Sequence, residues 1–208
     1  MKKVFAIVAL VAAMFVAGNA QAQTTVNIGY SPETFKTSYN SNSSNVNFQG
    51  FHVGFTTNVK LVQDLGIAAG AQFRMNMNSE SELSGTVKTK DTQMLIDVPV
   101  LINYSININN NFAITPFVGP MVSFAVLGKT NTKTFAGSTE LTDTDYNWYG
   151  EDSDFKRFNL YGVFGANVRF SNFNLYGGYR LGMLNLLKDS GEVTMKTNGF
   201  FVGLGFTL

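Results

Sequence analysis

Apolar residues recur at every second position along most of the chain, which is the period of a β-strand with one apolar face. The clearest case is the segment 48–61, where Phe51, Val53 and Phe55 alternate with polar or small residues. Apolar residues at helical spacing are missing outside the polar connections. The pattern predicts eight strands, which cover residues 26–30, 48–61, 67–77, 94–104, 112–126, 158–170, 173–183 and 200–208.

The connections between these strands alternate strictly in length. Short turns are expected at 62–66, 109–111 and 171–172. Long polar connections are expected at 32–47, 78–92, 128–156 and 185–197. This alternation puts every long connection at one end of an antiparallel meander and both termini at the other. We therefore expect an all-β fold, an eight-stranded antiparallel up-and-down barrel.

A barrel of eight such strands can close with its apolar face outward or inward. An outer-membrane barrel turns the apolar face to lipid, whereas a soluble lipocalin-like carrier encloses an apolar cavity. Short turns at one end and long loops at the other favour the transmembrane barrel. An interfacial girdle is also indicated by the aromatic residues beside the short turns, which are Tyr104, Phe112, Phe170, Phe173 and Phe206.

The first 22 residues have the features of a secretory signal peptide. Two lysines follow Met1, an apolar run extends over residues 4–17, and Ala20-Gln21-Ala22 matches a signal-peptidase site. We expect cleavage after Ala22, which leaves residues 23–208 as the barrel domain of an exported protein.

Composition excludes several other classes of protein. The chain lacks cysteine, so disulfide scaffolds and Cys-based zinc sites are excluded. The formal net charge of +1 argues against a nucleic-acid partner, which requires a basic surface.

Two strand motifs and one longer region resemble the PorT-like outer-membrane β-barrel family. Residues 96–104 (IDVPVLINY) resemble its "IPLLLKY"-type strand, and residues 114–120 (ITPFVGP) resemble its "PYxxxGP" pattern. The region 160–186 resembles its "GxG…Y…GL.N" pattern, although Asp97 stands where the family usually has Glu or Gln. The resemblance implies an integral outer-membrane barrel of a Gram-negative cell, and it implies no single activity.

Nothing in the sequence indicates an enzyme, a catalytic residue or a bound cofactor. His52 is the only histidine, and no Ser or carboxylate lies near it in the sequence. The spacing of Asp143, Asp145, Asn147 and Asp154 weakly resembles a calcium-binding EF-hand loop, but Trp148 replaces the required glycine. We otherwise expect no metal site.

Strand parity instead predicts a polar network inside the barrel. Its members are His52, Lys60, Arg74, Asp97, Arg169 and Arg180. If Met77 pairs with Met94, Arg74 lies directly across from Asp97, and the two should form a buried ion pair. Bulky inward residues (Leu101, Phe117, Met121, Tyr161, Tyr176 and Phe201) predict a filled interior rather than a general porin channel.

The expected role is therefore structural or surface-interacting, with a small diffusion pore or a soluble ligand carrier as alternatives. The expected partners are outer-membrane lipid and lipopolysaccharide, the barrel-assembly machinery during insertion, and an extracellular partner bound through residues 128–156.

Overall fold

Every regular element of the protein that the structure describes is a β-strand. The computed structural model describes residues 22–82, 86–136, 139–151, 153–188 and 191–208. The strands are β1 (Ala22–Tyr30), β2 (Glu33–Tyr39), β3 (Asn42–Val62), β4 (Leu65–Glu82), β5 (Val87–Tyr104), β6 (Ile106–Asn109), β7 (Phe112–Ala136), β8 (Thr139–Asn147), β9 (Phe158–Phe170), β10 (Phe173–Gly182) and β11 (Thr194–Thr207). Among these residues, no helix is long and apolar enough to cross a membrane.

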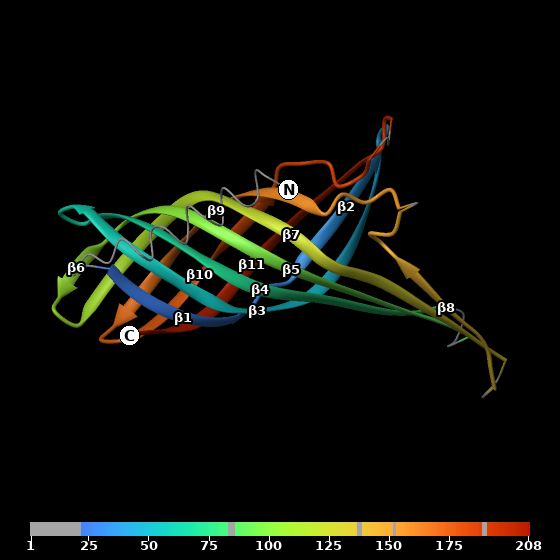
Figure 1. Cartoon of the computed structure of the whole chain (residues 1–208), viewed down its shortest axis with the longest axis horizontal. Helices are drawn as coiled ribbons and strands as arrows, with labels where there is room; N and C mark the ends of the chain where they lie inside the picture. The colour runs from blue at the N-terminus through green and yellow to red at the C-terminus, as the bar shows by residue number, and fades with distance from the viewer. Residues whose placement is uncertain (1–21, 83–85, 137–138, 152, 189–190) are drawn as a thin grey trace.

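The strands form one closed antiparallel barrel (Figure 1). The sheet runs in the order β1-β11-β10-β9-β7-β5-β4-β3-β2, and β1 also pairs with β3, so its two edges meet. Three of the eleven strands add no position to the barrel wall. β2 continues β1 in one register along β3 and β11, β6 continues β5 along β7, and β8 is the return strand of a hairpin with β7. The remaining eight positions confirm the predicted eight-stranded up-and-down barrel.

The outer surface of the barrel is apolar and its interior is polar. Ile28, Phe51 and Leu204 point outward with exposed fractions of 63%, 53% and 62%, whereas Arg74 and Asp97 lie inside with none. This polarity is that of a barrel surrounded by lipid. The lipocalin-like carrier, which needs an apolar interior, is therefore wrong.

Three of the four long connections are mostly strand, so their prediction as loops was wrong. β2 and β3 fill most of 32–47 and turn at Asn40, whose φ of 52° is left-handed. β4 and β5 extend into 78–92, and β7 and β8 occupy much of 128–156. Outside a membrane both faces of a strand are hydrated, so Ser, Thr, Asn and Lys can occupy either face and the apolar period disappears.

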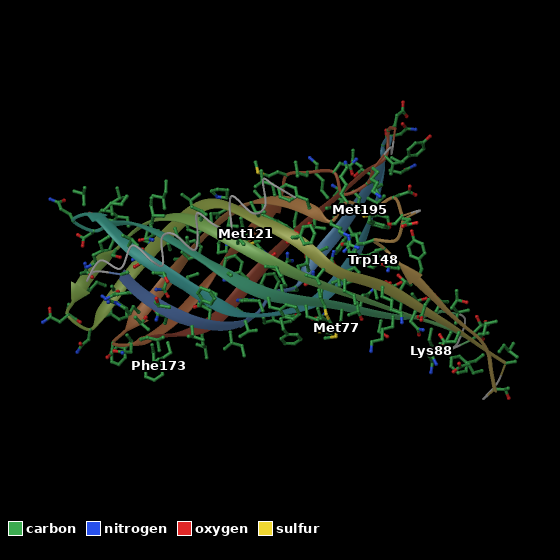
Figure 2. All side chains as sticks on the ribbon, in the orientation of Figure 1. Met77, Lys88, Met121, Trp148, Phe173 and Met195 are labelled. Carbon is green, nitrogen blue, oxygen red and sulfur yellow. The ribbon has the colours of Figure 1, made fainter. Side chains whose placement is uncertain are left out.

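The two ends of the barrel differ, as the alternation of connections predicted. The short turns at Gln63–Asp64, Asn110–Asn111 and Ser171–Asn172 lie at the end that also carries the C-terminus, on the left of Figure 1. Long hairpins extend from the opposite end, where Figure 2 shows Lys88 far from Phe173. The predicted signal peptide lies almost wholly on residues 1–21, outside the described residues.

The apolar band has the height of a membrane-spanning barrel. On β5 its outward residues extend from Met94 to Tyr104, which matches the nine to eleven residues of a transmembrane β-strand. β7 continues beyond this band through residues 128–136, an extension of about 30 Å at 3.3–3.4 Å per residue. The hairpins at this end therefore project well past the band.

Candidate functional site

Arg74 lies at the centre of a buried ion cluster inside the barrel. Its Nε donates a hydrogen bond to Asp97 Oδ2 at 2.7 Å, and its Nη2 donates to Asp97 Oδ1 at 3.2 Å. Its Nη1 donates to Glu33, and Ser123 donates from its hydroxyl to Asp97 at 2.5 Å. One guanidinium thus bridges two carboxylates, and all three side chains are buried.

The contact between Arg74 and Asp97 is diagonal, so the expected register was wrong. Met94 pairs with Met75, and Asp97 pairs with Gln72. Arg74 therefore lies two residues from the position opposite Asp97. Its long side chain crosses that offset, because diagonal neighbours on one face of a sheet remain within reach of long side chains.

Glu33 is the residue of this cluster that sequence reasoning missed. It is 2% exposed, and it accepts hydrogen bonds from Asn76 Nδ2 and the Tyr161 hydroxyl, both at 2.6 Å. The polar composition around it predicts the loop 32–47, which leaves Asp97 as the only acid expected inside a strand. Extending the alternation of 26–30 through Pro32 places Glu33 on the inward face, so the signal was present.

Among the described residues, the other members of the predicted network form no ion pair with the cluster, although Arg180 lies close enough to be attracted by Glu33 and Asp97. Arg180 is 2% exposed and donates to the Ser31 carbonyl at 3.2 Å. His52 Nε2 lies 2.6 Å from the Tyr176 hydroxyl. Arg169 is half-buried with its Nη2 3.5 Å from Asn107 Oδ1, and Lys60 is exposed.

Polar side chains continue from the cluster toward the hairpin end. Asn76 donates to Gln93 Oε1 at 3.1 Å, and Gln93 donates to the Tyr149 hydroxyl at 2.8 Å. Tyr149 belongs to a cluster of buried apolar and aromatic side chains with Phe35, Phe48, Leu95, Ala125, Trp148 and Leu186. This aromatic cluster fills the barrel at its hairpin end.

A second apolar cluster lies on the other side of the ions. Met121, Tyr161 and Val163 are buried there, and Leu101, Phe117 and Phe201 pack against them. The inward direction predicted for these bulky residues is confirmed. The interior therefore contains packed layers of side chains on both sides of Arg74.

The β7–β8 hairpin carries paired charges outside the apolar band. Lys129 Nζ lies 2.8 Å from Asp145, and Lys133 Nζ lies 3.0 Å from Glu140 and 3.3 Å from Asp143. The hydrogen bond from Lys129 holds the pKa of Asp145 below its ordinary value. Hydrogen bonds to Glu140 and Asp143 raise the pKa of Lys133.

The four candidate calcium ligands do not form a site. Asp143 and Asp145 lie on a strand and contact Lys133 and Lys129, while the Asn147 side chain accepts from the Tyr149 amide. In the described part of the chain, no group of three or more acidic or histidine residues could hold a metal ion. An EF-hand wraps its ligands around the ion in a loop, which a strand with lysine-paired carboxylates cannot do.

Comparison with protein families gives one match that covers most of the chain. The family model described as "Outer membrane protein beta-barrel domain" matches residues 12–188. No curated protein matches the sequence.

Several solved structures of small outer-membrane barrels resemble the fold at low sequence identity. The attachment invasion locus protein Ail of Yersinia pestis is 15% identical, with 90% of this chain and 99% of that chain covered and a TM-score of 0.46. Neisserial surface protein A is 13% identical, with coverage of 87% and 96% and a TM-score of 0.41. The outer-membrane protease OmpT of Escherichia coli is 9% identical, with coverage of 91% and 98% and a TM-score of 0.37.

Proposed function

The chain belongs to the outer membrane protein beta-barrel domain family, and from this premise we propose that it is a filled barrel that holds an interaction surface outside the outer membrane. The observation that carries the proposal is the contrast between a blocked interior and hairpin strands that continue past the apolar band, in β7 by about 30 Å along the strand. A barrel built only to span the membrane has no need of this extension.

The layered interior opposes a solute channel. The aromatic cluster, the ion cluster around Arg74 and the apolar cluster around Met121 follow one another along the barrel. Eight strands leave an interior that side chains can fill, whereas aqueous porins use 16–18 strands. The diffusion pore is therefore the less favoured function.

The interior also offers little support for catalysis. The hydrogen bond of His52 is to Tyr176, and no carboxylate of the described residues orients its ring. Acid–base catalysis by histidine usually needs such an orienting partner. We accordingly propose a non-enzymatic role, and the PorT-like assignment within the family rests on the strand motifs alone.

Side-chain contacts anchor the base of the β7–β8 hairpin. Trp148 at the base of the β7–β8 hairpin donates from Nε1 to Thr130 Oγ1 at 2.7 Å and stacks on Phe155 at 5.6 Å between ring centroids. The register places Lys129 and Lys133 on the face of the hairpin that continues the outer wall. An extracellular partner would meet this hairpin within residues 128–156.

We assign the hairpin end to the exterior and the end with the C-terminus to the periplasm. Outer-membrane barrels carry short turns on the periplasmic side and longer connections outside, which supports this orientation. The apolar band contacts membrane lipid, and the exposed Lys88, Lys90 and Lys129 beyond it face the region of lipopolysaccharide phosphates. Insertion would use the barrel-assembly machinery.

The deciding experiment removes the hairpin while keeping the barrel. Because Thr130 pairs with Tyr146, residues 131–145 can be replaced by Asn-Gly, which closes a two-residue hairpin. Cells that display the parent protein should adhere to cell-coated surfaces, and the shortened variant should lose this adhesion while its heat-modifiable gel mobility is unchanged. Equal adhesion by the two proteins would reject the interaction surface.

Orientation and conductance are tested separately. An epitope tag at Thr142 should bind antibody on intact cells, and the pure protein should give no stable large conductance steps in a planar bilayer. Labelling only after the outer membrane is broken would reverse the orientation, and large steps would favour the pore.

A further inference from the structure

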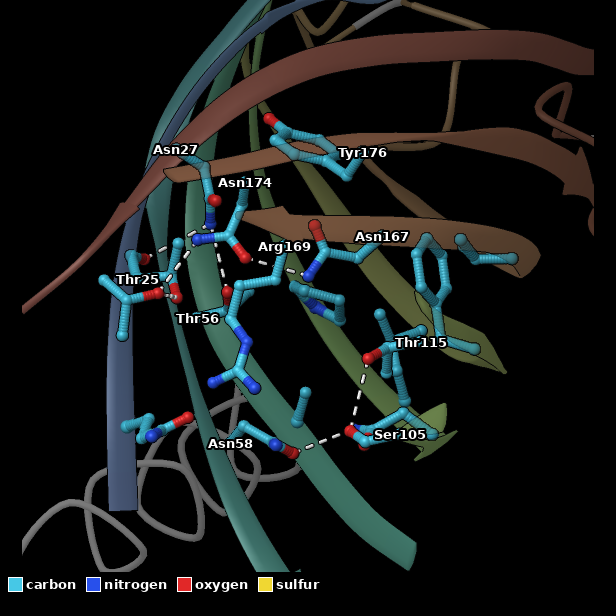
Figure 3. A pocket seen from close by; sticks show the side chains of 18 of the residues that line it. Thr25, Asn27, Thr56, Asn58, Ser105, Thr115, Asn167, Arg169, Asn174 and Tyr176 are labelled. Carbon is cyan, nitrogen blue, oxygen red and sulfur yellow. Dashed lines mark hydrogen bonds between the residues drawn. The ribbon is translucent and has the colours of Figure 1, made fainter. Parts of the chain in front are cut away.

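A cavity of about 160 Å³ lies inside the barrel at the short-turn end (Figure 3). Its outer part is lined by the exposed Gln23, Lys60 and Asn107, and its inner part by the buried His52 and Arg180. It has no part in the interaction surface proposed above, which lies at the opposite end of the barrel.

The lining of this cavity is positively charged. Lys60, Arg169 and Arg180 line it, and none of its lining residues is Asp or Glu. The acids of the barrel interior, Glu33 and Asp97, form their hydrogen-bonded ion pairs with Arg74, and they attract Arg180 only from a longer distance. An anion would therefore meet a positively charged lining, in which no carboxylate of the described residues is hydrogen-bonded to Arg180.

Arg180 lacks the partners that a buried guanidinium normally has. It is 2% exposed, its Nε has no hydrogen-bond partner, and no carboxylate of the described residues forms an ion pair with it. Its Nη2 donates to the Ser31 carbonyl, and its Cζ lies 5.6 Å from the centre of the Phe201 ring. Buried charges are usually paired, so the protein alone leaves Arg180 under-satisfied.

Several neighbouring polar side chains hydrogen-bond to one another, although the side-chain oxygens Oδ1 of Asn103 and Asn167 have no partner. Figure 3 shows Asn27, Asn167 and Asn174 in hydrogen bonds within the cavity wall, with Asn27 to Thr56 at 3.0 Å and Asn167 to Asn174 at 2.9 Å. These bonds fix the wall and leave Arg180 as its under-used donor. His52 Nδ1 is also without a partner.

Two glycines accommodate the side chains of His52 and Tyr176 in the cavity wall. A Cβ on Gly203 would lie 2.3 Å from the Tyr176 hydroxyl, and one on Gly29 would lie 2.5 Å from His52 Cε1. Both distances are too short for real contacts, so the two glycines make room for the His52–Tyr176 pair. Leu101, Phe117 and Phe201 supply an apolar wall close to this pair.

We propose that this cavity binds a small organic carboxylate, with its carboxylate on Arg180 and its apolar body against Phe117 and Leu101. A guanidinium matches the planar, two-oxygen geometry of a carboxylate. The volume also suits such a ligand, because a cavity of about 150 Å³ accommodates benzene. An aromatic or short branched carboxylate therefore fits both the charge and the size.

The test uses 4-fluorobenzoate as the probe and the mature protein in a neutral maltoside detergent. A ¹⁹F NMR titration should show saturable binding that weakens with added salt, and the neutral analogue 4-fluorobenzyl alcohol should not saturate. Arg180→Gln should weaken binding by at least about tenfold, since hydrogen bonds to charged groups contribute about 1.5–3 kcal/mol. Arg169→Gln at the cavity mouth is the matched control and should change affinity much less.

A second variant keeps the test decisive if Arg180→Gln does not fold. Ala68→Phe leaves every charge in place and fills the cavity from the β4 wall, so it should abolish binding in a protein with normal heat-modifiable mobility. The proposal is overturned if the parent protein shows no saturable binding, if the alcohol binds as well as the carboxylate, or if a folded Ala68→Phe variant still binds.

Discussion

The two halves of the barrel interior treat buried arginine in opposite ways. On the hairpin side, Arg74 contacts Glu33 and Asp97 and is held by their hydrogen bonds. On the short-turn side, the equally buried Arg180 has one carbonyl acceptor and an aromatic neighbour. The same inward face of the barrel wall thus contains one saturated arginine and one with spare donors. The difference separates a part of the interior that stabilises the fold from a part that is available to a ligand.

The largest expected effect comes from removing the saturated arginine. Arg74→Met leaves Glu33 and Asp97 buried without their ion-pair partner, which should cost about 3–5 kcal/mol of unfolding free energy or prevent folding. Urea titration followed by heat-modifiable gel mobility measures this loss. Adding Glu33→Gln and Asp97→Asn to the same chain should recover most of it. A stable single variant would contradict the cluster.

A second variant distinguishes a cluster of three charges from a simple pair. Asp97→Asn should lower the unfolding free energy by about 1–3 kcal/mol, because the amide replaces a charged acceptor of Arg74. In an isolated pair, Arg74→Gln in the same chain would restore part of the loss. In the three-charge cluster, adding Arg74→Gln to Asp97→Asn should lower the unfolding free energy further, because Glu33 then also loses its ion-pair partner. Partial recovery in urea would show that Glu33 contributes little.

Arg180 should behave differently from Arg74 in the ligand-free protein. Arg180→Met breaks no ion pair among the described residues, but it leaves Arg74 alone to balance the carboxylates of Glu33 and Asp97. The loss of unfolding free energy should therefore be smaller than that of Arg74→Met, about 1–2 kcal/mol. The same urea assay applies, with Arg74→Met as the reference. A loss as large as that of Arg74→Met would erase the contrast between the two halves.

The smallest effect concerns the exposed hairpin and its dependence on pH. Because pairing lowers the pKa of Asp145, its contribution to hairpin order is complete at neutral pH and is lost as the pH falls through that lowered value. The pKa of Lys133 is raised, so its contribution to hairpin order is complete at neutral pH and is lost only as the pH rises through that raised value. Proteolysis of the hairpin should therefore speed up at acid pH, below the ordinary range of an aspartate, and less so in Asp145→Asn, while the barrel stays intact. If proteolysis accelerates equally in the parent protein and in Asp145→Asn, the Lys129–Asp145 pair does not cause the pH dependence.

Sequence alone predicted the parts of the fold that the membrane dictates. Within the apolar band, lipid demands an apolar residue at every second position, so the alternation of Phe51, Val53 and Phe55 was sufficient to assign them to the outer face. Parity also placed Arg74 and Asp97 on one inward face. The register of β4 and β5 could not be predicted, because it depends on the length of a polar hairpin that carries no such alternation.

Glu33, the residue of the ion cluster that the sequence did not predict, was missed for a different physical reason. Ser31 and Pro32 have the composition of a turn, and Pro cannot donate a backbone hydrogen bond to a neighbouring strand. In the barrel, the Ser31 amide still donates to Gly50 and both sides of Pro32 keep one register along β3, so the strand continues to Glu33. Tertiary pairing overrode the local signal, and with it the position of an acid that the ion cluster requires.

The ion cluster also distinguishes a rolled sheet from an open one. In an uncurled sheet that runs from β2 through β3, β4, β5 and β7 to β9, five spacings of about 4.8 Å would hold Glu33 about 24 Å from Tyr161. In the closed barrel the Tyr161 hydroxyl donates to Glu33 at 2.6 Å. A half-assembled chain therefore exposes Glu33 without this donor, and the full set of contacts forms only when the first and last strands meet. The buried charges thus favour completion of assembly, since a sheet that stops short of closure leaves them incompletely satisfied.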